Sequence, residues 1–133
     1  MPQKKTKKVA AKNTDYKRFP DIEFSENSLV ILNKRYLIKD LETREPIEEP
    51  RDLFIRVAKA IAAGSKKACP KMSVTELKKT EEKFYKLMAR KDFFPNSPTL
   101  MNAGRELPNL SACFVLPIED SMNDIFTTVR DAA

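Results

Sequence analysis

The sequence predicts an α+β fold in which helices dominate and one strand lies near the C-terminal end. Two observations lead to this fold class. Apolar residues recur at helical spacing in three segments between residues 25 and 90. One short run, from Ser111 to Leu116, alternates with period two and stands between two prolines. The length of 133 residues suits one domain or part of one.

Three helices are expected within residues 20–92, which we interpret as one helical domain. The first follows a serine N-cap and covers residues 25–38. The second, residues 50–64, starts with proline at its first position and ends at a glycine. The third, residues 73–90, opens with a Ser-x-x-Glu capping box. Two prolines in residues 39–50 favour an extended connector or a short hairpin between the first two helices.

Residues 93–133 have a different character, because they contain four prolines and little charge until near their end. This segment cannot be helical throughout. If Ser111 to Leu116 forms a strand, its alternation places Ser111 and Cys113 on the same face. A last helix is expected after Ser121, which is a suitable N-cap.

Composition excludes several kinds of chemistry. The chain has no histidine, so it has no imidazole base and no zinc site of the Cys/His type. Its only glycines, Gly64 and Gly104, cannot build a Walker loop or a GxGxxG turn. No apolar run approaches the ~20 residues of a membrane span. We therefore expect a cytoplasmic protein that has no membrane partner.

The net charge of +6 is concentrated at the N-terminus. Seven Lys and Arg residues in positions 1–18 face Asp15 alone, whereas residues 19–133 carry eighteen basic and eighteen acidic groups. Residues 1–19 are thus expected to form a disordered basic tail. The tail could contact polyanions or simply aid solubility. We favour solubility, because no aromatic platform accompanies the lysines.

Four features could carry chemistry, and each also has a purely structural explanation. Cys113 would present a thiol beside a hydroxyl, but free cysteines are usually small buried apolar groups. Cys69 lies in a lysine-rich loop and could equally be an incidental exposed thiol. Asp120 and Ser121 could bind an anion at a helix start or merely cap that helix. Residues 96–99 could cradle a ligand or form an ordinary turn.

A family resemblance decides among these alternatives. It rests on two runs near the C-terminus, FFPNSPTLMNAG and LSACFVLPIEDSMNDIF. They resemble the start of the catalytic barrel of the ribonucleotide reductase large subunit, most closely of the adenosylcobalamin-dependent class II enzymes. Two upstream runs, ENSLVILNKRYLIKD and PRDLFIRVAKAIA, resemble the short helical N-terminal domain of that group. The resemblance spans residues 20–133. It implies that residues 93–133 begin a ten-stranded α/β barrel, truncated here, in an N-terminal fragment.

The resemblance also implies a reaction, in which a thiyl radical converts ribonucleoside di- or triphosphates to deoxyribonucleotides for DNA synthesis. Two cysteines supply the electrons and become a disulfide, and Cys113 matches the first of these redox-active thiols. Ser97 matches a hydroxyl that binds the substrate phosphate or ribose. Ala112 stands where some relatives have serine, so only its main chain could contact substrate.

Cofactor and partners follow from the same resemblance. Asp120, Ser121 and Met122 match the start of an allosteric site for a deoxynucleoside triphosphate near the dimer interface. Adenosylcobalamin would be held mostly by parts of the enzyme outside this chain, and a thioredoxin-type reductant would supply electrons. The rest of the reductase, or a homodimer partner, would complete the enzyme. The chain is expected to be inactive alone, because the radical-bearing cysteine matches nothing in it.

One alternative comes from a different functional class. A non-enzymatic helical interaction module with a basic nucleic-acid-binding arm would also explain the tail and the three amphipathic helices. It gives no reason for the motifs SPTLMNAG and SACF. We therefore prefer the reductase.

Overall fold

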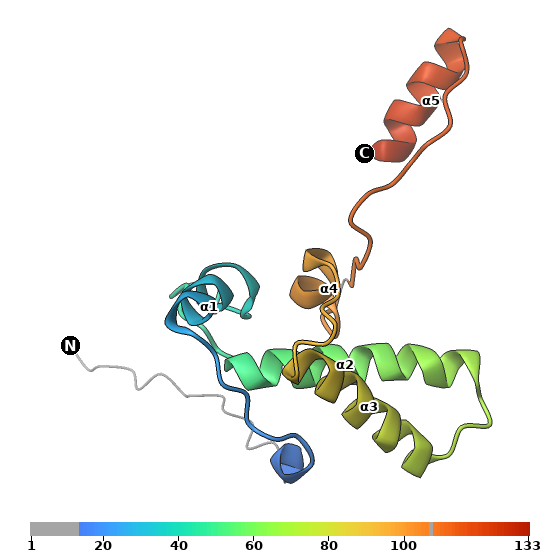
Figure 1. Ribbon diagram of the computed structural model, residues 1–133. Helices are drawn as coiled ribbons and strands as arrows, with labels where there is room; N and C mark the ends of the chain where they lie inside the picture. Colours follow the sequence, from blue (N-terminus) through green and yellow to red (C-terminus); the bar gives the residue numbers. More distant parts are fainter. Residues whose placement is uncertain (1–13, 107) are drawn as a thin grey trace.

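The computed structural model describes residues 14–106 and 108–133 and shows two parts (Figure 1). We call residues 14–110 the helical body and residues 111–133 the C-terminal arm. The elements in chain order are the 3₁₀ helix η1 (Thr14–Arg18), α1 (Glu26–Ile31), the π-helical segment η2 (Leu32–Tyr36), α2 (Pro50–Ala68), α3 (Val74–Ala89), α4 (Ser97–Asn102) and α5 (Met122–Ala132). In the arm, α5 stands away from the body at the end of a long segment.

The core of the body lies between α2 and α3. Helix α2 begins with Pro50 and buries one continuous apolar face. That face consists of Leu53, Phe54, Ile55, Val57, Ala58 and Ala62. Helix α3 adds Tyr85 and Met88 to the core. Burial raises the pKa of the Tyr85 hydroxyl, which donates a hydrogen bond to the Pro20 carbonyl.

Part of the expected basic tail is folded. Residues 14–18 form η1, and the Phe19 side chain is fully buried, 4.9 Å from the Tyr85 ring between centroids. The Arg18 guanidinium pairs with Glu81 at 3.0 Å and Glu82 at 2.9 Å on α3. The expectation of disorder therefore fails for residues 14–19, because the buried Phe19 side chain and two ion pairs of Arg18 attach them to the body. Residues 1–13 lie outside the described residues.

The first two predicted helices exist but differ from expectation. Ser25 caps α1 as predicted, accepting a hydrogen bond from the Ser28 amide at 3.3 Å. The α-helix ends at Ile31 and a π-helical segment follows it to Tyr36, so the prediction of one helix to residue 38 is wrong. Helix α2 runs on to Ala68, so the predicted end at Gly64 is wrong. A glycine ends a helix by adopting positive φ. In the described residues only one glycine does so, Gly104 at 78°, and Gly64 remains helical.

The third helix and the connector match the sequence closely. Ser73 and Glu76 form the predicted capping box, with amide-to-side-chain distances of 3.2 and 2.7 Å. The bond from the Ser73 amide lowers the pKa of the Glu76 carboxyl. The connector folds as a short hairpin closed by one antiparallel bridge between Lys39 and Pro46. Amides of its turn donate to Asp40 and lower the pKa of that carboxyl.

The predicted strand from Ser111 to Leu116 is absent. Among the described residues there is no strand, and the bridge in the connector is the only β pairing. Phe114 is 72% exposed and Val115 is 94% exposed, so neither face of the segment is covered. A strand needs a neighbour for its backbone amides and carbonyls. The described fold is therefore helical, which confirms the helical part of the prediction, and the described residues do not form its β part.

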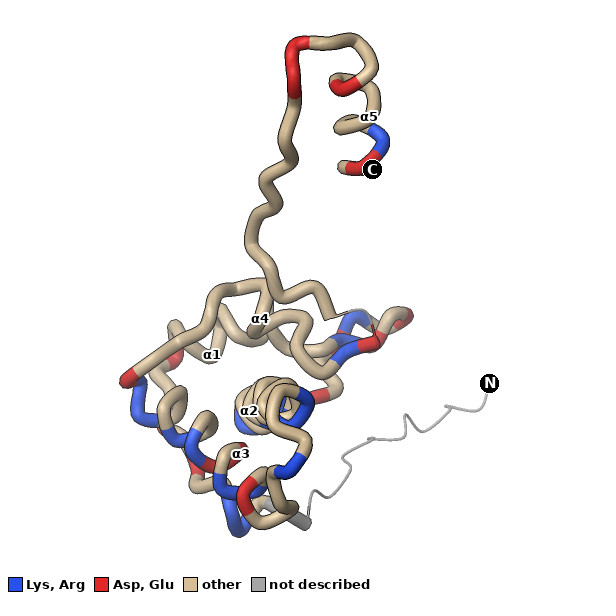
Figure 2. The backbone as a smooth tube through the Cα atoms, turned by 90° about the vertical axis from the view of Figure 1, so that its right-hand side faces the viewer, with Lys and Arg blue, Asp and Glu red and all other residues tan. Residues whose placement is uncertain are grey.

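The arm ends in an amphipathic helix, α5, that buries none of its residues against the rest of the described structure. Ser121 caps α5 as predicted, accepting from the Asp124 amide at 3.1 Å. Its large apolar side chains are exposed, namely Met122, Ile125, Phe126 and Val129. The segment leading to α5 carries no charge from Pro108 to Ile118, as the tan tube in Figure 2 shows. None of the described helices is long and apolar enough to cross a membrane.

Candidate functional site

The site is organised around the short helix α4, which the sequence did not predict. Asn96 caps it, accepting a hydrogen bond from the Thr99 amide at 3.0 Å. Pro98 occupies one of its first two positions, where no intrahelical N–H bond is lost. Leu100 and Ala103 bury their side chains in the core. The segment expected to be a loop or a turn is thus a helix fixed to the body.

One arginine of α2 holds the C-terminal end of α4. The Arg56 guanidinium donates to the carbonyls of Ala103 at 2.5 Å and Leu100 at 3.3 Å. It also makes two hydrogen bonds to the Glu48 carboxylate, at 2.9 and 3.0 Å. The two side chains are only 13% and 11% exposed, so their charges pair largely out of water. Arg56 therefore joins α2, α4 and the connector at one point.

Gly104 allows the Arg56 side chain to lie close to the backbone at the end of α4. It follows α4 with φ of 78°, a backbone conformation that favours glycine. A Cβ atom at this position would lie 2.8 Å from Cγ of Arg56. A side chain here would therefore move the arginine from the carbonyls that it binds.

Polar side chains of α4 and its N-cap form hydrogen bonds to the segment that leads to Cys113. Asn96 Nδ2 and Thr99 Oγ1 both donate to the carbonyl of Leu110, at 3.1 and 3.3 Å. Asn102 Nδ2 donates to the carbonyl of Asn109 at 2.9 Å. These three bonds fix where the C-terminal arm leaves the body.

Ser97 lies in the first turn of α4. Its hydroxyl is 3.0 Å from the hydroxyl of Tyr36, the last residue of η2. The two residues are 61 positions apart in the chain. Tyr36 packs its ring against the hydrophobic core, so its hydroxyl reaches Ser97 from a fixed base. Sequence reasoning missed Tyr36, because no local pattern signals a contact over that distance.

The predicted site residues fall into two groups. Ser97 lies on α4. Ala112 and Cys113 lie at the start of the arm, directly after residues 109–110, to which α4 is hydrogen-bonded. Both Ala112 and Cys113 are exposed, and Cys113 is a free thiol. Asp120, Ser121 and Met122 lie at the start of α5, beyond the uncharged segment. The described residues thus bring the proposed substrate residues to one end of the body and leave the proposed effector residues apart.

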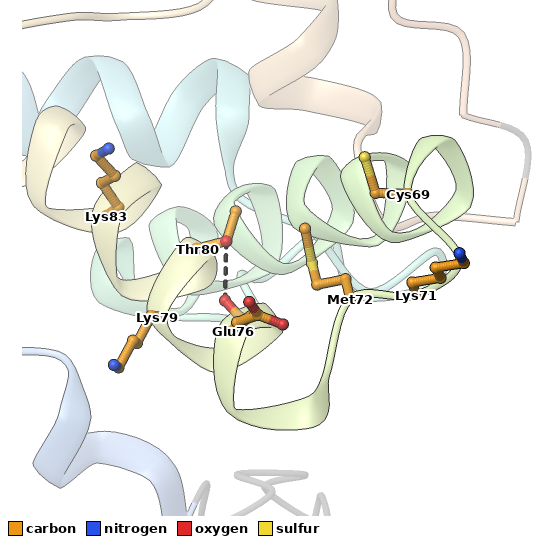
Figure 3. A pocket seen from close by; sticks show the side chains of 7 residues that line it. All are labelled: Cys69, Lys71, Met72, Glu76, Lys79, Thr80 and Lys83. Carbon is orange, nitrogen blue, oxygen red and sulfur yellow. Dashed lines mark hydrogen bonds between the residues drawn. The ribbon is translucent and has the colours of Figure 1, made fainter.

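Two hollows in the described surface contain none of these residues. One, of about 570 Å³, lies at the junction of α2 and α3 (Figure 3). It is lined by Cys69, Lys71, Met72, Glu76, Lys79, Thr80 and Lys83. Cys69 is exposed and its thiol is free, as expected of a loop cysteine. The other, of about 320 Å³, lies between α5 and the segment before it, and its lining includes Glu119 and Asp124. No cluster of metal-ligating side chains occurs in residues 14–106 and 108–133.

Comparison with known proteins identifies the family. Residues 22–108 match the model of the ribonucleotide reductase all-alpha domain, which is well over half of this chain. This chain therefore belongs to the ribonucleotide reductase large-subunit family through that N-terminal domain. The matched range ends between α4 and the segment that carries Cys113.

Individual relatives agree with the family match. A vitamin B12-dependent ribonucleoside-diphosphate reductase of Mycobacterium tuberculosis is 40% identical over 113 residues, covering 85% of this chain. An enzyme of the same name from Thermoplasma acidophilum is 32% identical and covers 85% of the chain. A ribonucleoside-diphosphate reductase large subunit of African swine fever virus is 32% identical and covers 90%.

These matches occupy a small part of each relative. The chain covers 16%, 21% and 14% of the three proteins' own lengths. The family match supports the reductase interpretation over the alternative of a nucleic-acid-binding interaction module.

Proposed function

We propose that this chain supplies the N-terminal helical domain and the start of the catalytic barrel of an adenosylcobalamin-dependent ribonucleotide reductase. The proposed reaction converts ribonucleoside diphosphates, the substrate class in the relatives' names, to deoxyribonucleotides. The observation that carries this proposal is the pair of hydrogen bonds from Asn96 and Asn102 to the backbone carbonyls of residues 109–110. In a chain of this family, these bonds would hold the segment that bears Cys113 at the same end of the body as the Ser97 hydroxyl.

Cys113 is the proposed first redox thiol. In the net reaction the 2′-hydroxyl leaves the ribose as water and a C–H bond replaces the C–O bond. The two electrons come from Cys113 and a second cysteine outside this chain, which join in a disulfide. A thioredoxin-type dithiol then reduces that disulfide by thiol exchange. The exposed, unpaired thiol in the structure is compatible with this role.

Ser97 and Ala112 are the proposed substrate contacts in this chain. The Ser97 hydroxyl can donate a hydrogen bond to a phosphate or ribose oxygen. Ala112 has no polar side chain and can offer only its backbone amide and carbonyl. A neighbouring barrel strand would convert the extended run from Ser111 to Leu116 into the predicted strand, because it would supply the missing backbone partners.

Asp120, Ser121 and Met122 are the proposed start of the effector site for a deoxynucleoside triphosphate. Their position beside α5, which has an exposed apolar face, supports this proposal. An apolar helix face of this kind is buried when another helix packs against it. A homodimer partner or the rest of the reductase would supply that surface and complete the site.

The described residues do not by themselves form a site for adenosylcobalamin. The two hollows are lined largely by lysines, carboxylates and threonines. Neither is the mainly apolar, enclosed cavity that binds a large cofactor. The cofactor would generate the radical elsewhere in the enzyme, and no step on the residues of this chain runs through it.

A fusion enzyme tests the proposed function. The chain is joined to the part of the M. tuberculosis reductase that follows the matched region. Reduction of CDP is then measured with adenosylcobalamin and a dithiol. We expect deoxyribonucleotide from the fusion enzyme and none from the 133-residue chain alone, which has a single candidate redox thiol.

Two matched cysteine variants locate the chemistry. Cys113→Ser should abolish steady-state turnover while 3′-hydrogen exchange persists, because exchange uses a different cysteine. Cys69→Ser should keep nearly full turnover, because Cys69 lies in the α2–α3 loop. An inactive fusion enzyme, or equal turnover in the two variants, would overturn the proposal.

A further inference from the structure

We propose that Tyr36 is a positioning residue that orients the Ser97 hydroxyl toward the phosphate or ribose of the substrate. This inference rests on the proposed function, which makes Ser97 a substrate contact. Its structural basis is the 3.0 Å contact between the two hydroxyls. It assigns a role to the helical domain in the chemistry of the barrel.

The π-helical segment η2 determines where Tyr36 lies. The Leu37 amide bonds to the Leu32 carbonyl at 3.0 Å, five residues back, in place of the usual four. The wider turn sets the direction of the side chains within it, including that of Tyr36, its last residue. Leu32 and Leu37, on either side of the turn, are both buried and hold it in the core. Tyr36 therefore points toward α4 from a rigid support.

The Ser97 hydroxyl is available for a ligand because another residue caps α4. Asn96 accepts the hydrogen bond from the Thr99 amide, so Ser97 has no capping task. Arg56 fixes the other end of the same helix through the carbonyls of Leu100 and Ala103. Tyr36 is thus the residue whose hydroxyl contacts the Ser97 hydroxyl directly.

The chemistry of the ligand sets the direction of the hydrogen bonds. Phosphate oxygens are acceptors, so Ser97 must donate its proton to bind one. The Ser97 oxygen can then accept the proton of the Tyr36 hydroxyl. These two hydrogen bonds form a series from Tyr36 to Ser97 to the substrate. The first bond strengthens the bond from Ser97 to the substrate, because each hydrogen bond polarises the next.

The test uses the fusion enzyme with three single variants and one double variant. Tyr36→Phe should raise KM for CDP about threefold to tenfold and leave kcat nearly unchanged, since one neutral hydrogen bond is lost. Ser97→Ala should raise KM more strongly. In the double variant, the effect of Tyr36→Phe should vanish, because the tyrosine acts only through the serine.

Tyr16→Phe is the matched control. It also removes one tyrosine hydroxyl hydrogen bond, the bond of 2.6 Å that Tyr16 donates to Asp52 of α2. It should leave KM unchanged. Equilibrium dialysis of CDP without cofactor gives a second readout, in which Tyr36→Phe should weaken binding by the same factor.

Each outcome is decisive. A KM that is unchanged in Tyr36→Phe, or a full Tyr36 effect in the Ser97→Ala background, would overturn the positioning role. Equal KM shifts in Tyr36→Phe and Tyr16→Phe would show a general loss of structure and would overturn it too. An inactive wild-type fusion enzyme that still binds CDP through Tyr36 and Ser97 would refute the proposed function alone.

Discussion

The helical body buries the large apolar side chains of its longest helix, whereas the C-terminal arm exposes those of α5. In the body, Phe54 is 1% exposed, whereas Phe126 on α5 of the arm is 64% exposed. Both lie on regular, amphipathic helices. The difference teaches that an amphipathic pattern is enough to form a helix, but a core also needs a second apolar surface in the same chain.

The largest expected difference between the parts comes from matched phenylalanine substitutions. Phe54→Ala should lower the free energy of unfolding by about 3–5 kcal/mol, because it leaves a cavity in the core. Phe126→Ala should change it by less than about 0.5 kcal/mol in this chain, because the side chain is already in water. Urea unfolding followed by circular dichroism measures both. A large loss in Phe126→Ala would mean that the arm folds back onto an apolar surface.

The two glycines give the next largest contrast, with opposite signs. Gly104→Ala should destabilise the body by about 1–3 kcal/mol, because φ is positive and the new Cβ meets Arg56. Gly64→Ala should stabilise it by about 0.5–1 kcal/mol, because Gly64 is helical and open space surrounds it. Thermal melts of the two variants measure the difference. Destabilisation by Gly64→Ala would contradict the helical assignment at that position.

Helix caps extend the comparison to local structure. Ser73→Ala removes the cap of α3 and should cost about 1 kcal/mol of global stability, because α3 forms part of the core. Ser121→Ala removes an equivalent cap from α5. It should reduce helical content in the arm without moving the main unfolding transition. Equal shifts of that transition in both variants would show that the arm and the body unfold together.

The last expected effect depends on pH and is confined to the body. The hydrogen bond to Asp52 raises the pKa of the Tyr16 hydroxyl from 10.0 to about 12. The folded state therefore holds this proton more tightly than the unfolded state. The hydrogen bond from the protonated Tyr16 hydroxyl stabilises the folded state fully below pH 10.0. This contribution to the free energy of unfolding is lost as pH rises toward about 12. Tyr16→Phe should flatten this part of the curve of stability against pH, and an unchanged curve would contradict the assignment.

Local signals in the sequence predicted the elements that depend on local bonds. The capping box at Ser73 and the cap at Ser121 each join residues three positions apart, and both form as predicted. The predicted strand from Ser111 to Leu116 does not form in the described residues, because its stability depends on a neighbouring strand that they lack. Helix α4 was missed, because Pro98 within it and Pro95 before it favour turns and its stability comes from contacts with α2.

The candidate site could be predicted only in part, for a related reason. The resemblance of two motifs pointed to Ser97 and Cys113. The groups that hold them could not be inferred, because Tyr36 contacts Ser97 across 61 residues and Arg56 reaches Ala103 across 47. Contacts of this range depend on the packed fold.

The contacts of Arg56 also imply an order of folding. Its partners lie 8, 44 and 47 residues away along the chain, so the connector can reach it long before α4 does. Closing the longer loops costs more conformational entropy, and α4 should dock after α2 and α3 have paired. A helix that docks late tends to open early in the native state, as hydrogen exchange often reveals. We therefore expect the Ser97 hydroxyl to belong to a folding unit that detaches and returns while the rest of the core remains closed.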